Sequence, residues 1–100
     1  MEDRAYLVAN KGITTRMSEA EALKLIQEVA NEIDTFSLLS PSERSKIRLI
    51  KRLDNLQNDS DISIGISNKD THLNLTIENR KLAFVAECTV TSRAIMMVSE

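Results

Sequence analysis

Residues that could act in acid–base or nucleophilic chemistry are few in this sequence. His72 is the single histidine and Cys88 the single cysteine of a 100-residue chain. An internal disulfide or a cysteine-based zinc site needs more cysteines, and no second ligand stands at a suitable spacing from His72. Asp70, two positions before that histidine, is typical of a turn. We therefore expect no metal ion and no cofactor, and we interpret Cys88 as a small buried side chain.

Carboxylates and glycines offer little further chemistry. General acid–base catalysis needs a buried carboxyl group with a raised pKa, whereas most acidic residues here fall on helix exteriors or in turns. Glu87, on the polar side of an alternating run, is the exception. Two glycines cannot form a glycine-rich phosphate loop. We expect no enzymatic activity, and a catalytic site would have to draw on Glu87, His72 or Cys88.

The densest charge lies in "SPSERSKIRLIKRLDNLQ", residues 40–57, which carry five basic and two acidic side chains. At a helical period its apolar residues share one side, and four cations form a stripe roughly opposite. The stripe consists of Arg44, Arg48, Lys51 and Arg52. Such a stripe could meet solvent, an acidic protein surface, or the phosphates of a nucleic acid.

Composition favours protein over nucleic acid as the partner of this stripe. The net charge is −2 and aromatic residues make up 3% of the chain, so cations for phosphates and rings for stacked bases are both scarce. The chain has no apolar run of 18 residues and no signal-peptide pattern. We expect a cytoplasmic protein that does not act at a membrane.

Two start signals predict two helices. Ser18 with Glu21, and Ser40 with Glu43, have the spacing of capping boxes, in which each side chain bonds the other residue's backbone amide. The first helix is acidic outside and the second is basic. Between them the link "TFSLL", residues 35–39, is too apolar for a free linker. We expect its Phe and Leu side chains to pack beneath the domain.

After residue 61 the apolar period changes from helical to two, which predicts three antiparallel strands with one buried face. We predict a two-layer α+β fold in which two amphipathic helices pack on an antiparallel β-meander of three to five strands. The chain forms a single domain over residues 1–100, divided into an N-terminal strand or hairpin (1–16), a helical pair (18–57) and the β-meander (61–100).

The final apolar segment is a second candidate surface. Ile95, Met96 and Met97 are consecutive, so at least one of them faces away from the core. We place this last strand at a sheet edge, where it would pair with a second copy or with a target by strand addition. The alternative is a sheet covered on both faces by the chain itself.

Together these features predict a small non-catalytic protein-interaction factor that binds a larger protein. A regulator, an inhibitor or a chaperone-like adaptor encoded by a bacterium or a phage would fit, and we expect it to form a homodimer. The alternative is a nucleic-acid-binding regulator that uses the basic stripe. The predicted partner-binding residues are Arg44, Arg48, Lys51, Arg52, Ile95, Met96 and Met97.

Overall fold

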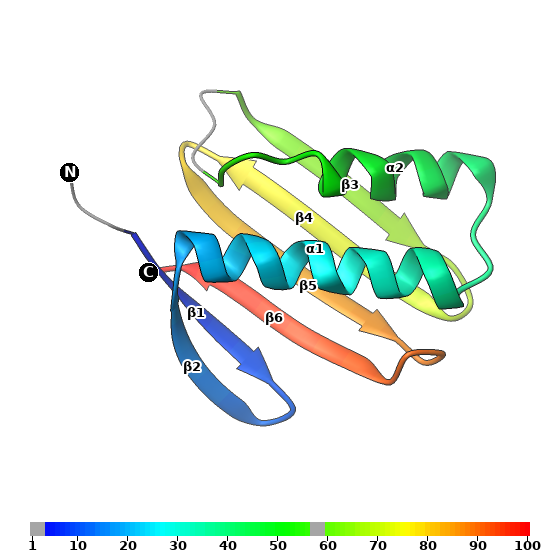
Figure 1. Cartoon of the computed structure of the whole chain (residues 1–100), viewed down its shortest axis with the longest axis horizontal. Helices are drawn as coiled ribbons and strands as arrows, with labels where there is room; N and C mark the ends of the chain where they lie inside the picture. The colour runs from blue at the N-terminus through cyan, green and yellow to red at the C-terminus, as the bar shows by residue number, and fades with distance from the viewer. Residues whose placement is uncertain (1–3, 57–59) are drawn as a thin grey trace.

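The computed structural model describes residues 4–56 and 60–100. Two strands come first, then two helices, then four strands (Figure 1). The elements are β1 (Ala5–Asn10), β2 (Ile13–Ser18), α1 (Glu19–Phe36), α2 (Pro41–Lys51), β3 (Ile62–Ser67), β4 (Thr71–Glu78), β5 (Lys81–Cys88) and β6 (Arg93–Ser99). Residues 1–3 of the predicted N-terminal segment, and residue 57 at the predicted end of the helical pair, lie outside the described residues.

All six strands form one antiparallel sheet in the order β2-β1-β6-β5-β4-β3. Both helices lie on the same face of this sheet (Figure 1). The α+β class with two helices on an antiparallel sheet is thereby confirmed. The strand count exceeds the predicted three to five, because the N-terminal run forms a hairpin that joins the same sheet as the meander.

The last strand lies inside the sheet and not at its edge, so that prediction is wrong. β6 is hydrogen-bonded to β1 on one side and to β5 on the other. Its backbone groups are therefore occupied, and strand addition to β6 has no free backbone to use. The described edges are β2 and β3. The error has a long-range cause, because β1 at the start of the chain pairs with β6 at its end.

Both helices begin where the capping boxes predict. The Ser18 and Ser40 hydroxyls accept from the backbone amides of Glu21 and Glu43, and each glutamate accepts from the backbone amide of its serine. The second helix ends at Lys51, earlier than the pattern predicted. Neither helix in the described part of the chain is long and apolar enough to cross a membrane.

The core lies between the helices and the sheet and is almost entirely aliphatic. Its largest fully buried side chains include Tyr6, Phe84, Ile26, Ile33, Ile50, Leu56, Leu73, Leu75 and Met97. β1, β3, β4, β5 and β6 contribute alternate residues to it, as the period of two requires, whereas β2 contributes only the partly buried Met17. Leu49, which the helical period placed on the apolar side of the second helix, is exposed instead.

The link between the helices does not pack beneath the domain as predicted. Phe36 is 66% exposed and Leu38 is 95% exposed, and only Leu39 packs against the core. Ser37 lies between them in an extended conformation, with its side chain buried against Cys88. Because successive side chains of an extended segment point in opposite directions, a buried Ser37 turns both neighbours outward.

Two tight hairpin turns set the strand register. Lys11 and Gly12 both have positive φ, and so do Asn79 and Arg80. Two central residues with positive φ define a type I′ turn, whose twist matches that of the flanking strands. The β1–β2 and β4–β5 hairpins are therefore closed by two-residue loops.

Native-state hydrogen exchange tests the position of β6. We expect backbone amides of β6 to exchange at least ~100-fold more slowly than the outward-pointing amides of β2 and β3, because β6 is bonded on both sides. The edge strands of the same sheet serve as the internal control. Exchange in β6 as fast as in β2 would contradict the strand order.

Candidate functional site

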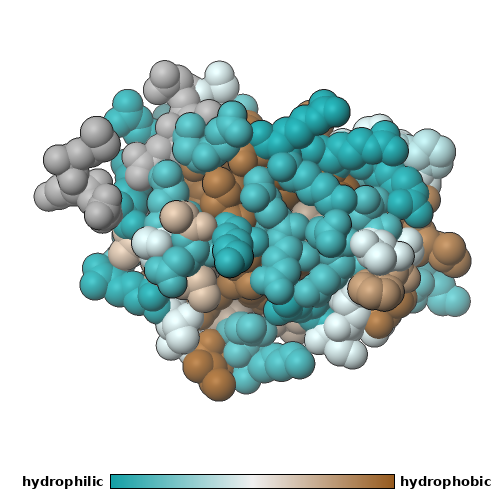
Figure 2. Space-filling view, in the orientation of Figure 1, coloured by the Kyte–Doolittle hydropathy of each residue, from teal (hydrophilic) through white to brown (hydrophobic). Residues whose placement is uncertain are grey.

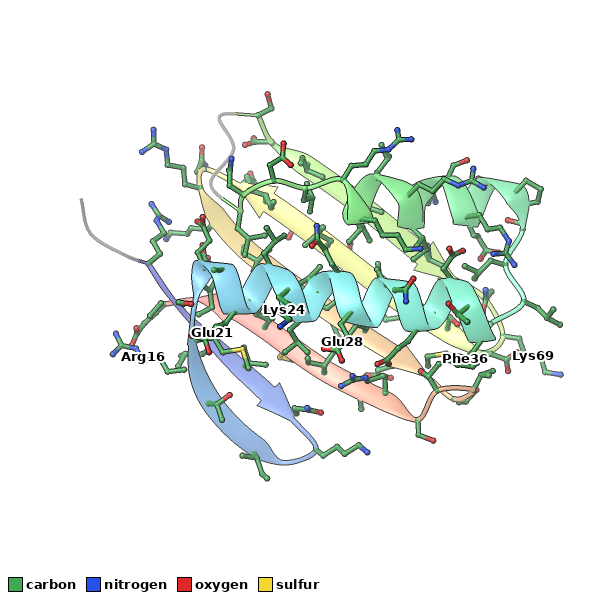
Figure 3. The ribbon with its side chains drawn as sticks, in the orientation of Figure 1. Arg16, Glu21, Lys24, Glu28, Phe36 and Lys69 are labelled. Atoms are coloured by element: carbon green, nitrogen blue, oxygen red, sulfur yellow. The ribbon has the colours of Figure 1, made fainter. Side chains whose placement is uncertain are left out.

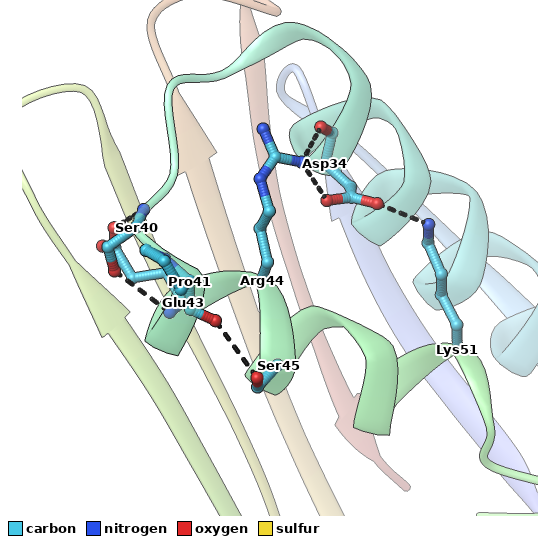
Figure 4. Close-up of polar contacts among 7 residues, drawn as sticks. All are labelled: Asp34, Ser40, Pro41, Glu43, Arg44, Ser45 and Lys51. Carbon is cyan, nitrogen blue, oxygen red and sulfur yellow. Dashed lines mark hydrogen bonds and ion pairs between the residues drawn. The ribbon is translucent and has the colours of Figure 1, made fainter.

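An aspartate on α1 binds two of the four cations of the predicted basic stripe. Arg44 Nη1 lies 2.8 Å from Asp34 Oδ1, and Lys51 Nζ lies 2.8 Å from Asp34 Oδ2 (Figure 4). The hydrogen bond from Lys51 lowers the pKa of Asp34; partial burial opposes this shift, and the charges of Lys51 and Arg44 add to it. Two of the four cations therefore join α2 to α1 through ion pairs.

The other two cations of the stripe remain on the surface. Arg48 and Arg52 are exposed, and neither side chain makes an ion pair or hydrogen bond to another residue that the structure describes. Leu49, also exposed, lies on the same outer side of α2. Lys46 donates to the carbonyl oxygen of Gly65 at 2.7 Å, which joins α2 to β3. The outer surface of α2 thus carries less free positive charge than the sequence suggests.

The consecutive residues of β6 separate onto the two faces of the sheet. Ile95 and Met97 are buried beneath the helices, whereas Met96 is 56% exposed on the opposite face. We call that opposite side the open face, because no helix or strand in the described ranges covers it. Of these three predicted contact residues, the structure leaves only Met96 available at the surface.

The open face has an apolar centre formed by β1, β6 and β5. The strand register places Leu7 opposite Val98, and Met96 opposite Val85. Six side chains make up this centre: Leu7, Ala9, Ala83, Val85, Met96 and Val98. A shallow hollow of about 210 Å³ lies over the β4, β5 and β6 part of it. Small polar residues of β3 and β4 continue the face toward one edge.

A groove opens at one end of the molecule, between the end of α1 and the β5–β6 turn. It has a volume of about 630 Å³, and Phe36 and Val90 form its apolar walls. Phe36 projects from the last turn of α1 (Figure 3). We call Phe36, Leu38 and Val90 the apolar end, and the hollow beside them the end groove. Apolar surface is visible at this end of a helix side that is otherwise mostly hydrophilic (Figure 2).

An ion pair lines the end groove and joins α1 to β6. Arg93 Nε and Nη2 lie 2.8 Å from the two carboxylate oxygens of Glu32. These bonds lower the pKa of Glu32 more than its burial raises it. Glu32 therefore stays ionised near neutral pH and is poorly suited to donate a proton.

The groove also contains buried polar atoms with unused bonding capacity. Asn10 Oδ1 is buried and accepts no hydrogen bond from any described residue. The Thr91 hydroxyl, which helps lower the pKa of Cys88, makes no hydrogen bond of good geometry. A buried polar atom without a partner costs about 1–3 kcal/mol of stability.

The three residues on which a catalytic site could draw point to different faces. His72 and Glu87 are directly opposite each other on the open face, and both are exposed. Cys88 points to the helix side and is buried. All three border a hollow of about 520 Å³ at the ends of β4, β5 and β6. The thiol is thus separated from the imidazole and the carboxylate by the sheet.

Hydroxyl groups surround the single thiol. Ser37 Oγ lies 3.2 Å and Thr71 Oγ1 lies 3.5 Å from Cys88 Sγ. Burial raises the pKa of Cys88, but these hydrogen bonds outweigh it and bring the pKa from 9.0 to about 7. The sequence predicted the burial of this cysteine and gave no sign of its hydroxyl partners.

No group of three or more histidine, cysteine, aspartate or glutamate side chains in residues 4–56 and 60–100 could hold a metal ion. The chain matches no protein-family model, no curated protein and no solved structure. The candidate surfaces therefore rest on their own geometry: the apolar end with its groove, the open face, and the outer side of α2.

Replacement of Asp34 by Asn tests the fastening of the two helices. We expect Asp34→Asn to lower the free energy of unfolding at pH 7 by about 1 kcal/mol, because Lys51 and Arg44 lose their shared anion. Because the pKa of Asp34 is lower in the folded chain than in the unfolded one, this stabilisation is fully present at pH values well above the ordinary pKa of 3.8. It is lost progressively as the pH falls below that value. Urea denaturation at several pH values measures the difference.

Asp54→Asn is the matched control, since Asp54 is exposed just beyond the end of α2. It should change stability by less than about 0.5 kcal/mol at any of these pH values. Equal effects of the two substitutions, or an Asp34→Asn deficit that does not shrink in acid, would contradict the role of Asp34.

The hydroxyl groups around Cys88 make the ionisation of its thiol measurable. We expect the ultraviolet absorbance of the thiolate to titrate with a pKa of about 7 in the folded protein. Ser37→Ala removes one hydrogen bond and should move the midpoint upward toward 9.0. Ser42→Ala, on the exposed side of α2, should leave it unchanged. A native midpoint near 9.0 in all three proteins would contradict this environment.

Proposed function

We propose that this protein is a non-catalytic, cytoplasmic binding factor that attaches to a larger protein through its apolar end. The observation that carries the proposal is the outward position of Phe36 and Leu38, at 66% and 95% exposure, with Phe36 lining the end groove. Val90 adds a third exposed apolar side chain from the β5–β6 turn. Single exposed leucines are ordinary, whereas several exposed apolar side chains at one end of a molecule are typical of a contact surface.

Covering this surface would contribute substantially to the free energy of binding. Burial of a phenylalanine or leucine side chain contributes about 1.5–3 kcal/mol. Phe36 is one of only two phenylalanines in the chain, and Leu38 is almost wholly in solvent. Aromatic side chains that fill a partner's pocket are among the commonest binding hot spots. Docking these two residues would offset part of the entropy lost on association.

The groove indicates what kind of segment would bind there. Phe36 and Val90 are its apolar walls, and Asn10, Thr91 and Ser92 add uncharged polar groups to its lining. Glu32 and Arg93 neutralise each other, which leaves Lys11 as the remaining charge of the groove lining, so an uncharged or acidic segment is favoured over a basic one. An extended segment of a larger protein, with one apolar side chain and free backbone amides, matches these features.

The nucleic-acid alternative has less support. Useful phosphate binding commonly involves six to ten contacts, whereas Asp34 occupies Arg44 and Lys51. Arg48 and Arg52 remain, with Leu49 exposed on the same side of α2. Two free arginine side chains are fewer than such phosphate binding uses.

Affinity capture from extracts of the source cells, with quantitative mass spectrometry, tests the proposal. We expect Leu38→Asp and Phe36→Asp each to reduce the captured partner at least ~10-fold, which corresponds to about 1.4 kcal/mol of binding free energy. Leu49→Asp is the matched control, because it makes the same change at an exposed leucine on α2. It should capture as much partner as the unmodified chain.

Circular dichroism should show all three variants folded, since the substituted side chains lie outside the core. A partner retained by Leu38→Asp and Phe36→Asp but lost with Arg48→Glu would place binding on α2 and overturn the assignment to the apolar end. Binding to DNA or RNA that weakens steeply with salt would favour the alternative function.

A further inference from the structure

Within residues 4–56 and 60–100, no second layer covers the open face. Helices cover one side of the sheet only, and the Cα positions span 16 Å along the shortest axis of the molecule. A sheet and one helix layer account for that thickness. Leu7, Met96 and Val98 are exposed at the centre of the uncovered side, where the register makes them neighbours. This surface is separate from the apolar end.

One row of paired residues crosses the whole sheet and divides the open face into two halves. The row runs through Thr15, Val8, Met97, Phe84, Leu75 and Ile64, each directly opposite the next. Its side chains point to the helix side. On the open face, the residues before and after this row on each strand therefore lie at equal distances from it.

We propose that a second copy of this chain covers the open face, related by a twofold axis that lies beneath this row and runs across the strands. Rotation about that axis places each strand over the same strand of the second copy, in the opposite direction. The two sheets then form a sandwich with the helices outside, at the ≈ 10 Å spacing of packed sheets. The arrangement is isologous, as closed dimers are.

The axis brings larger apolar side chains over smaller ones. Met96 meets the partner's Val98, Val85 meets the partner's Ala83, and Leu7 meets the partner's Ala9. On β4, Asn74 meets the partner's Thr76, and both side chains can form hydrogen bonds. On β3, Gly65 has no side chain and Ser63 a small one, so this strand projects little toward the second copy. On β1, β3, β4, β5 and β6 the face is therefore self-complementary in size as well as in polarity, whereas on β2 Arg16, paired with Glu100 of its own chain, meets the partner's Thr14.

Charged residues at the two ends of the face are also matched by this axis. β5 has Lys81 at one end of its open side and Glu87 at the other, so each lysine meets the partner's Glu87. β4 has the opposite order, and His72 meets the partner's Glu78. An axis parallel to the strands would keep each charge at its own end and would bring neither pair together. Charge complementarity therefore selects the first arrangement.

The available area is sufficient for a stable dimer. Six strands at about 4.8 Å span roughly 29 Å, and about seven residues per strand span roughly 23 Å. Each copy thus offers on the order of 600 Å², and the pair about 1,200 Å², which is the lower end of specific interfaces. We expect a dimer that forms at ~100 μM protein or below.

Sedimentation equilibrium of the full chain tests the proposal. We expect a mass of about twice the 11.2 kDa of one chain. Val98→Asp and Met96→Asp should weaken the dimer at least ~100-fold, because each buries an unpaired charge in the apolar centre. Leu38→Asp, which alters the apolar end, should leave the dimer intact, so failure of this proposal and of the proposed function can be told apart.

Charge reversal tests the direction of the axis and needs no change in the apolar centre. Lys81→Glu and Glu87→Lys should each weaken their own homodimers at least ~10-fold by opposing like charges. An equimolar mixture of the two variants should restore association as a heterodimer, since both cross-pairs are then opposite in sign. Native mass spectrometry identifies that species.

A mass of 11.2 kDa for the unmodified chain at ~100 μM would overturn the proposal and leave the open face to a different partner. A dimer that survives Val98→Asp, or a variant mixture that shows no preference for the heterodimer, would overturn the proposed face or axis. Circular dichroism separates weakened association from loss of folding in each variant.

Discussion

The pairing of the first strand with the last is the constraint on which the rest of this structure depends. β1 binds β6 along its length, and this contact joins residues separated by nearly the whole chain. It places β2 and β3 at opposite edges of the sheet, so the segment between them must cross all six strands. Two helices make that crossing, which is why both lie on one face and none lies on the other. Contacts of such sequence separation are slow to form, because the loop they close is long.

Local signals predicted the elements but could not predict their neighbours. The capping boxes at Ser18 and Ser40 fix the helix starts through contacts within four residues, and both are confirmed. Alternation likewise indicated which residues of each strand face the core. Strand order depends instead on which surfaces remain unpaired after local folding, and no pattern within β6 tells whether one side or both sides of its backbone are bonded. The prediction of an edge strand failed for that reason.

For the candidate surfaces too, local patterns were informative and contacts between elements were not predicted. Helical period placed Arg44 and Lys51 on the side of α2 away from its apolar stripe, yet both reach Asp34 at the far end of α1. Five residues separate that aspartate from the cap of α2, so a short link was the available signal for this contact. At Phe36 and Leu38 composition misled, because apolar residues in a link suggested burial. The hydrogen bond of Ser37 to Cys88 decides the matter by turning its two neighbours into solvent.

The two proposed contacts constrain each other through symmetry. The end groove lies where β6 begins and α1 ends, at one end of the strands. A twofold axis across the strands carries that end to the opposite side of the dimer, so the two apolar ends would point away from each other. A single compact target could then occupy only one of them. Binding at both ends would require two targets, or one target long enough to span the dimer. Only in the second case would the two binding events be linked, so that the overall affinity exceeds that of a single end.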